Sequence, residues 1–110
     1  MNIEGKILII DDEIDICKQL SGLLSDRGFK CNYCISSEEG IKDFKNNSYS
    51  LVILDIWLNN SKFDGFQTLE EIKELNDNVP VIMISGHGNI ETAVNSIKKG
   101  AYDFIEKPLD

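Results

Sequence analysis

The chain has 110 residues, of which 42% are hydrophobic and 27% charged, as in an average soluble globular domain, so disordered, collagen-like and membrane-spanning classes are excluded. It carries 19 acidic and 11 basic residues, and the formal charge of −8 repels nucleic acid phosphates, so we expect no direct contact with DNA. No apolar run could cross a bilayer, the first residues lack a secretory signal and the 3 cysteines form no disulfide framework, which together predict a cytoplasmic protein without a membrane partner.

Five short segments are predicted to be β-strands. Residues 6–10, 51–54 and 81–84 are nearly continuous apolar runs rich in β-branched side chains, which is typical of strands covered on both faces. Residues 29–35 alternate between apolar and polar side chains, and residues 102–105 form a short run that includes an aspartate. These two segments are predicted to be the edge strands of one sheet.

Apolar residues at helical spacing fall between the strands, within residues 16–24, 41–44, 66–72 and 90–97. Strands that alternate with helices pair in parallel through right-handed crossovers. With the second and fifth strands at the edges, the order is 2-1-3-4-5. The sequence therefore predicts an α/β fold, a doubly wound five-stranded parallel sheet of the flavodoxin-like type.

Polar side chains follow four of the predicted strands: Asp11 and Asp12, then Asp55, Ser85 and Lys107. Ligands of such sheets bind beyond the carboxyl ends of the strands, so we expect these side chains to share one rim. Crowded carboxylates raise each other's pKa unless a cation compensates, and Mg²⁺ prefers a few carboxylates together with phosphate oxygen. An ammonium and a hydroxyl suit phosphoryl oxygens, and an aspartate can attack phosphorus to give an aspartyl phosphate.

In their order and position these residues closely resemble the receiver domain of bacterial two-component response regulators, and the resemblance covers essentially the whole chain. The matching motifs are Asp11-Asp12, Asp55, Ser85, Lys107-Pro108 and the segment 100–104 just upstream. The resemblance implies that Asp55 is the phosphoacceptor, that a sensor histidine kinase is the phosphoryl donor and that the chain is a regulatory phosphoprotein rather than a turnover enzyme.

The resemblance also implies the roles of the neighbouring residues. Asp11, Asp12, Asp55 and the backbone carbonyl of Trp57 are expected to hold Mg²⁺, for which Mn²⁺ could substitute. Ser85 and Lys107 are the expected phosphoryl-binding residues. Ser85 and Phe104 are the expected switch, in which the ring fills space that the serine vacates.

One loop departs from the common receiver pattern. Receivers commonly have a Met-Pro pair soon after the phosphoacceptor, whereas residues 56–65 contain no proline, and Asp64-Gly65 comes later in the sequence than usual. This loop is similar to that of the NtrX nitrogen-regulation type within the wider NtrC class, whose members carry an ATPase domain and a DNA-binding domain after the receiver. We therefore expect DNA to be contacted only through C-terminal domains that are absent from this chain, and the regulated output to be transcription.

Receivers normally end with a fifth helix after Lys-Pro, whereas this sequence stops at Asp110. We expect residues 1–110 to be a receiver domain that lacks the fifth helix and forms the N-terminal fragment of a longer regulator. Bare apolar surface would then be covered in a homodimer or a higher oligomer.

Two aromatic side chains border the expected site. Trp57 lies two residues after Asp55, and His87 lies two residues after Ser85. One hypothesis is that both control the approach of water to the acyl phosphate and so its lifetime. The alternative for His87 is a solvated loop residue without a role.

Other functions remain as alternatives. A magnesium-dependent phosphatase with an aspartyl nucleophile is built on a similar sheet, but such enzymes resemble one another in an Asp-x-Asp motif that residues 11–13 lack. A flavin-binding or purely structural module does not need the acidic trio. A receiver that has lost phosphate acceptance is disfavoured because every expected site residue is present. Cys31 and Cys34 point to opposite faces of a strand and form no metal site.

Overall fold

The computed structural model describes residues 5–59, 61–86 and 89–107. Strands and helices alternate along these residues, and all the strand pairs are parallel. In chain order the elements are β1 (Lys6–Ile10), α1 (Ile14–Asp26), β2 (Lys30–Cys34), α2 (Ser37–Asn46), β3 (Tyr49–Asp55), α3 (Gly65–Leu75), β4 (Val81–Ser85), α4 (Ile90–Lys98) and β5 (Asp103–Glu106).

The sheet order is β2-β1-β3-β4-β5, which confirms the predicted flavodoxin-like topology. The inner strands β1, β3 and β4 are almost wholly buried, because their apolar residues meet side chains on both faces. The edge strands β2 and β5 are more exposed, as their mixed composition predicted. The observed β2 is one residue shorter at each end than predicted, and β5 begins and ends one residue later than predicted.

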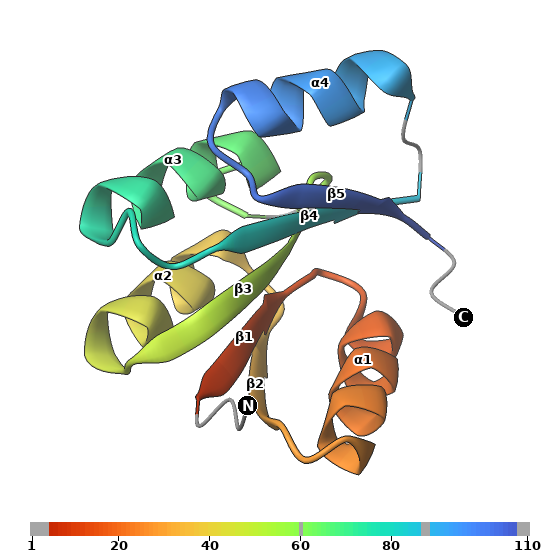
Figure 1. Cartoon of the computed structure of the whole chain (residues 1–110), viewed down its shortest axis with the longest axis vertical. Helices are drawn as coiled ribbons and strands as arrows, with labels where there is room; N and C mark the ends of the chain where they lie inside the picture. The colour runs from red at the N-terminus through yellow and green to blue at the C-terminus, as the bar shows by residue number, and fades with distance from the viewer. Residues whose placement is uncertain (1–4, 60, 87–88, 108–110) are drawn as a thin grey trace.

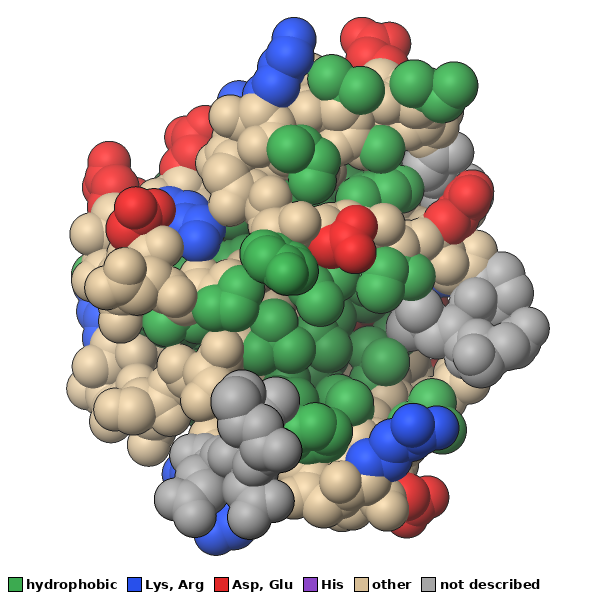
Figure 2. All heavy atoms as spheres, viewed as in Figure 1, with side chains coloured by type: hydrophobic (Ala, Val, Ile, Leu, Met, Phe, Trp, Pro, Cys, Tyr) green, Lys and Arg blue, Asp and Glu red, His purple; other side chains and the backbone are tan. Residues whose placement is uncertain are grey.

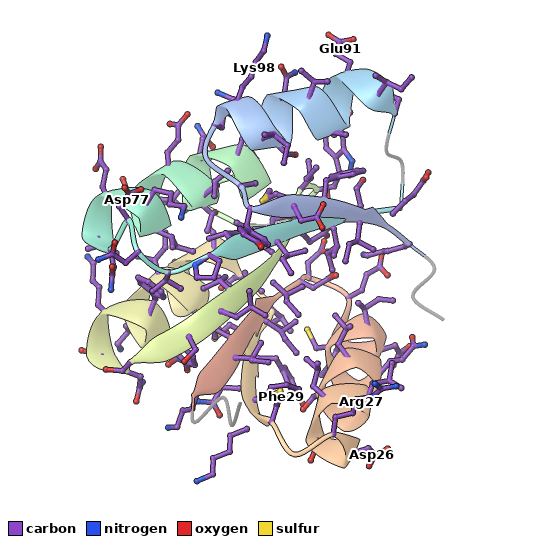
Figure 3. All side chains as sticks on the ribbon, viewed as in Figure 1. Asp26, Arg27, Phe29, Asp77, Glu91 and Lys98 are labelled. Atoms are coloured by element: carbon purple, nitrogen blue, oxygen red, sulfur yellow. The ribbon has the colours of Figure 1, made fainter. Side chains whose placement is uncertain are left out.

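Helices lie on both faces of the sheet, with α1 on one face and α2, α3 and α4 on the other (Figure 1). The larger core packs α2 and α3 against the sheet through residues such as Leu54, Leu69 and Met83. The smaller core lies between the sheet and α1 and contains Cys17. Phe29, just before β2, packs against this smaller core beside α1 (Figure 3).

Local signals in the sequence set the helix boundaries. Asn89 caps α4 by accepting a hydrogen bond from Thr92 N–H, and Asp64 forms a complete capping box at the start of α3. Gly28 and Gly100 have positive φ angles of 91° and 106°, a left-handed conformation that glycine adopts easily at the end of a helix. These signals set the starts of α3 and α4 and the turns that lead into β2 and β5.

Apolar side chains remain open on one side of the molecule, where Figure 2 shows them gathered from α4 across β5 and the sheet. Ile90, Ile97 and Tyr102 have exposed fractions of 85%, 51% and 75%. Within the described ranges there are four helices, and none follows β5. None of these helices combines the length and the apolar character needed to span a membrane.

Candidate functional site

The carboxyl ends of β1, β3, β4 and β5 meet at one rim of the sheet. Asp11 directly follows β1, Asp55 ends β3, Ser85 ends β4 and Lys107 directly follows β5. The strand register places these ends side by side, since Asp55 at the end of β3 pairs with Ile84, the residue before Ser85 in β4. The sequence-predicted polar residues therefore lie around a single site.

Three carboxylates form the centre of this site. Asp11, Asp12 and Asp55 each offer an oxygen, and these oxygens all lie within 4.8 Å of one another. Asp11 is fully buried, Asp55 is 3% exposed and Asp12 is half-buried. Oδ1 of Asp11 accepts a hydrogen bond from Glu13 N–H at 2.9 Å, which fixes the orientation of that carboxylate. The site is thus a cluster of three carboxylates, two of them buried and one half-buried.

Lys107 supplies a cation to the carboxylates. Its Nζ lies 3.0 Å from Asp11 Oδ2 and 3.8 Å from Asp55 Oδ1, and its side chain is only 11% exposed. Glu13 Oε2 lies 3.9 Å from the same Nζ. Within the described part of the chain, the buried Asp11 Oδ2 accepts no well-formed hydrogen bond, so the contact with Lys107 is an ion pair. One ammonium thus faces several carboxylates.

The pKa values reflect this excess of negative charge. Burial, and then the charge of Asp11, raise the pKa of Asp55 to about 7, although Lys107 acts in the opposite direction. Burial also raises the pKa of Asp11. Burial by itself would lower the pKa of Lys107, but the contacts with Asp11 and Asp55 raise it overall. The protein alone therefore leaves the carboxylates without full compensation.

The remaining predicted residues lie around this centre at different depths. Ser85 is fully buried, and its carbonyl accepts a hydrogen bond from Lys107 N–H at 2.8 Å. Phe104 pairs with Met83 and packs half-buried against the larger core, two residues along the strand from the rim. Trp57, two residues after Asp55, is 51% exposed, and His87 lies outside the described residues.

The sequence model of the response regulator receiver domain matches residues 7–110. The chain belongs to the response regulator receiver domain family. This membership confirms the family predicted from the sequence. The nitrogen assimilation regulatory protein NtrX of Azorhizobium caulinodans is 48% identical over 104 residues, which are 94% of this chain and 23% of that protein.

Solved structures show the same likeness. A crystal structure of NtrX from Brucella abortus superimposes with a TM-score of 0.93 at 46% identity, and the match covers 98% of this chain and 24% of that one. A crystal structure of the receiver domain of the same protein gives a TM-score of 0.90 at 48% identity, with 94% and 87% coverage. The receiver domain described here therefore spans less than a quarter of the length of the NtrX protein from Azorhizobium.

Receiver domains typically bind Mg²⁺ in an acidic pocket, and the residues of this chain fit such an ion. Three carboxylate oxygens lie close enough to share one cation, and one buried oxygen, Asp11 Oδ2, has no well-formed hydrogen bond within the described residues. Oxygen donors alone are the ligands that Mg²⁺ prefers, and a divalent charge would offset the raised pKa of Asp55.

Sequence reasoning missed several contacts that hold the site together. Asn59 N–H donates to Asp12 Oδ2 at 3.0 Å, and residues 61–63 bind the start of α2 through Ser37 and Glu38. In all of these bonds the donor is a backbone N–H group, which every residue except proline carries, so the type of the donor residue gives no signal for them. The unusual length of the loop after Asp55 was the only indication in the sequence.

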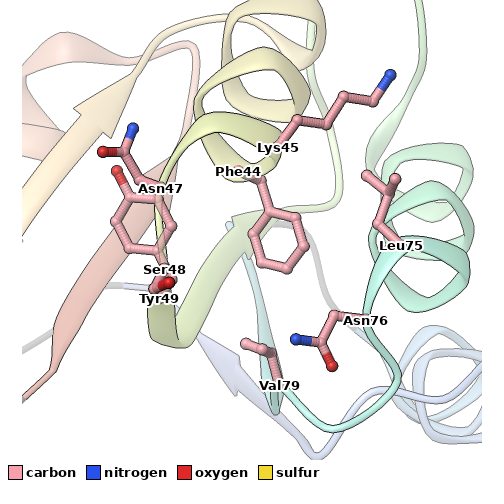
Figure 4. A pocket seen from close by; sticks show the side chains of 8 residues that line it. All are labelled: Phe44, Lys45, Asn47, Ser48, Tyr49, Leu75, Asn76 and Val79. Carbon is pink, nitrogen blue, oxygen red and sulfur yellow. The ribbon is translucent and has the colours of Figure 1, made fainter.

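A separate cavity of about 300 Å³ lies between the last turns of α2 and α3 (Figure 4). The residues that line it include Phe44, Tyr49, Leu75 and Val79. Tyr49 begins β3, so this cavity lies at the opposite end of the sheet from Asp55. It is therefore not part of the acidic site.

Proposed function

We propose that Asp55 accepts a phosphoryl group from a sensor histidine kinase in a Mg²⁺-dependent reaction, and that this modification switches a transcription-regulating output. The observation that carries the proposal is the meeting of Asp55 with Asp11, Asp12 and Lys107 at one rim. Membership of the receiver family supports the same role. The similarity to NtrX supports nitrogen regulation as the field of action.

The transfer is a displacement at phosphorus. A carboxylate oxygen of Asp55 forms the new P–O bond while the P–N bond of a phosphohistidine breaks, and the imidazole leaves with the bonding electrons and takes up a proton. Asp55 must be ionised to attack, and its pKa of about 7 means that the cation-free site is only partly ready at neutral pH. Bound Mg²⁺ would supply the charge that stabilises the phosphoryl oxygens.

Each neighbouring residue has a proposed part in this chemistry. Asp11, Asp12, Asp55 and the Trp57 carbonyl would hold Mg²⁺, or Mn²⁺ in its place. Lys107 Nζ lies 3.8 Å from Asp55 Oδ1, which supports its proposed contact with a phosphoryl oxygen on that carboxylate.

The proposed switch joins Ser85 to Phe104. Ser85 is held at the end of β4, and Phe104 lies half-buried on the neighbouring strand. Movement of the Ser85 hydroxyl toward the phosphoryl group would open space for the aromatic ring and so alter the surface formed by α4 and β5. Trp57 and His87 are proposed to limit the access of water to the acyl phosphate.

At the level of the whole protein, we propose that residues 1–110 form the N-terminal receiver of a longer cytoplasmic regulator. DNA would be contacted only by C-terminal domains. The exposed apolar side chains on α4 and beside β5 suit a homodimer or higher oligomer. The role is regulatory, with autophosphorylation and autodephosphorylation as the only intrinsic activities.

Incubation with Mg²⁺ and acetyl phosphate, followed by intact mass measurement, tests this proposal. One phosphoryl group should be added to the native chain and none to Asp55→Asn, whereas Asp26→Asn, an exposed carboxylate at the end of α1, should behave as the native chain does. Labelling of Asp55→Asn to the native extent would refute the assignment. Sustained turnover of a small phosphate ester would instead support the aspartyl phosphatase alternative.

A further inference from the structure

The loop between β3 and α3 is tied to the start of α2 by a group of hydrogen bonds. Ser37 Oγ accepts from Phe63 N–H at 2.9 Å and donates to Glu38 Oε1 at 3.1 Å. Glu38 Oε1 also accepts from Lys62 N–H at 3.2 Å, and Ser61 Oγ accepts from Ser37 N–H at 3.0 Å. We call these contacts the α2 clasp.

Ser37 is the centre of the clasp. Its side chain is fully buried, whereas Glu38 is exposed. The Ser37 hydroxyl acts as donor and acceptor at once, and the Ser37 backbone N–H is one of the helix-end donors that needs an outside partner. The neighbouring Ser36 caps α2 in the ordinary way, by accepting from Glu39 N–H at 3.3 Å.

The other arm of the same loop, residues 57–59, enters the acidic site. Asn59 N–H donates to Asp12 Oδ2 at 3.0 Å, and Leu58 is buried in the larger core. At its base the loop is closed by Gly65 N–H, which donates to the Ile56 carbonyl at 2.9 Å. This arm therefore orients one carboxylate of the cation site and carries the Trp57 carbonyl.

We propose that Ser37 is a positioning residue for the cation site, although it lies in α2, contacts only the far arm of the loop and does not touch a carboxylate of the site. The clasp holds residues 61–63 against α2, and the hydrogen bond between Gly65 and Ile56 holds the two ends of the loop together. With both of these parts held, residues 57–59 keep Asn59 N–H in contact with Asp12. Ordering a backbone costs conformational entropy, so a loop that is ordered in advance lets a cation bind without that cost. This inference rests on the proposed function, since it assigns a residue to the cation site proposed there.

Removal of the Ser37 hydroxyl should weaken cation binding as well as the fold. Ser37→Ala leaves Phe63 N–H without its acceptor and removes one of the two donors to Glu38 Oε1, while Lys62 N–H still donates to it. We expect the Kd for Mg²⁺ to rise by about fivefold, the equivalent of about 1 kcal/mol for one net hydrogen bond. Ser36→Ala, the matched control, should lower thermal stability through the lost cap but leave the Kd unchanged.

The test is a Mg²⁺ titration of the native chain, Ser37→Ala and Ser36→Ala, with no phosphoryl donor present. The chain has a single tryptophan, Trp57, whose backbone hydrogen-bonds Asp55 and which is 51% exposed, so we expect its fluorescence to change when the cation binds. The Mg²⁺-induced rise in melting temperature is an independent second readout. Ser61→Ala loosens the clasp from the loop side and should weaken binding in the same direction, which keeps the test informative where Ser37→Ala does not fold.

The outcomes separate this inference from the proposed function. A weaker Kd in Ser37→Ala and Ser61→Ala, with Ser36→Ala unchanged, supports the positioning role. Equal Mg²⁺ affinity in the native chain and all three variants, or equal loss in Ser36→Ala and Ser37→Ala, overturns it while leaving the cation site in place. Absence of any Mg²⁺ response in the native chain would overturn the proposed function and this inference together.

Discussion

The stability of the cation-free domain should fall as the pH rises, and Asp55 should cause most of that fall. The pKa of this carboxyl is raised from its ordinary value of 3.8 to about 7 by burial first and by Asp11 second. A carboxyl whose pKa is higher in the folded state than in the unfolded state favours folding below the unfolded pKa. That contribution is lost as the pH rises through the folded pKa.

The magnitude follows from the two pKa values. Each pH unit between them costs about 1.4 kcal/mol, so the complete loss is about 4 kcal/mol. Most of this loss falls within a pH range in which the protein can be studied. Between pH 5 and pH 8 the free energy of unfolding should fall by about 3 kcal/mol because of this one group. Asp55 is only 3% exposed, so solvent screening reduces this value little.

The assay is urea denaturation of the native chain and of Asp55→Asn at pH 5 and pH 8 in the presence of a chelator. Asp55→Asn should lose most of the pH dependence and be the more stable protein at pH 8. Asp26→Asn, whose carboxylate is exposed at the end of α1 and points away from the fold (Figure 3), should keep the native pH dependence. Saturating Mg²⁺ should restore stability to the native chain at pH 8. The reasoning is refuted if Asp55→Asn shows the same pH dependence as the native chain.

Three further predictions test the surroundings of the site. Gly65→Ala would place a Cβ 2.4 Å from the Asp55 carbonyl oxygen, so the free energy of unfolding should fall by about 2 kcal/mol and the melting temperature with it. In Gly22→Ala, the control in α1, the new Cβ meets nothing within 4 Å, and the variant should be slightly more stable than the native chain. Lys107→Met removes the ammonium that contacts Asp55, and the free energy of unfolding measured with urea should fall by about 3 kcal/mol at pH 8 and by less at pH 5. Equal losses at both pH values would contradict this prediction. Tyr49→Phe removes the phenol O–H that donates to the Asp43 carboxylate at 2.6 Å, so the free energy of unfolding should fall by about 1.5 kcal/mol while phosphoryl uptake stays unchanged. A change in uptake would contradict the separation of the two ends of the sheet.

The fold was predictable because its signals are local and agree with one another. The apolar runs of β1, β3 and β4 are long enough to mark buried strands, and the alternation of strands and helices leaves few topologies. The convergence of Asp11, Asp55, Ser85 and Lys107 follows from the same topology, since parallel strands end at one rim.

The contacts of the loop after Asp55 were not predictable in this way. Asn59 donates to Asp12 through its backbone, and Ser37 meets Phe63 across 26 positions of sequence. Such bonds depend on the path of the chain rather than on residue type. The burial of Asp11 Oδ2 without a well-formed hydrogen bond, among the residues described, is likewise a property of packing that composition does not encode.

A crystal structure of the chain with Mg²⁺ and beryllofluoride, a mimic of the phosphoryl group, tests the central claim most directly. The expected result is a beryllofluoride on the Asp55 carboxylate, a metal ion held by Asp12 and Asp55, and Lys107 Nζ in contact with a fluorine. The account would be contradicted by crystals in which the beryllofluoride is bound to another residue and the Asp55 side chain is unmodified.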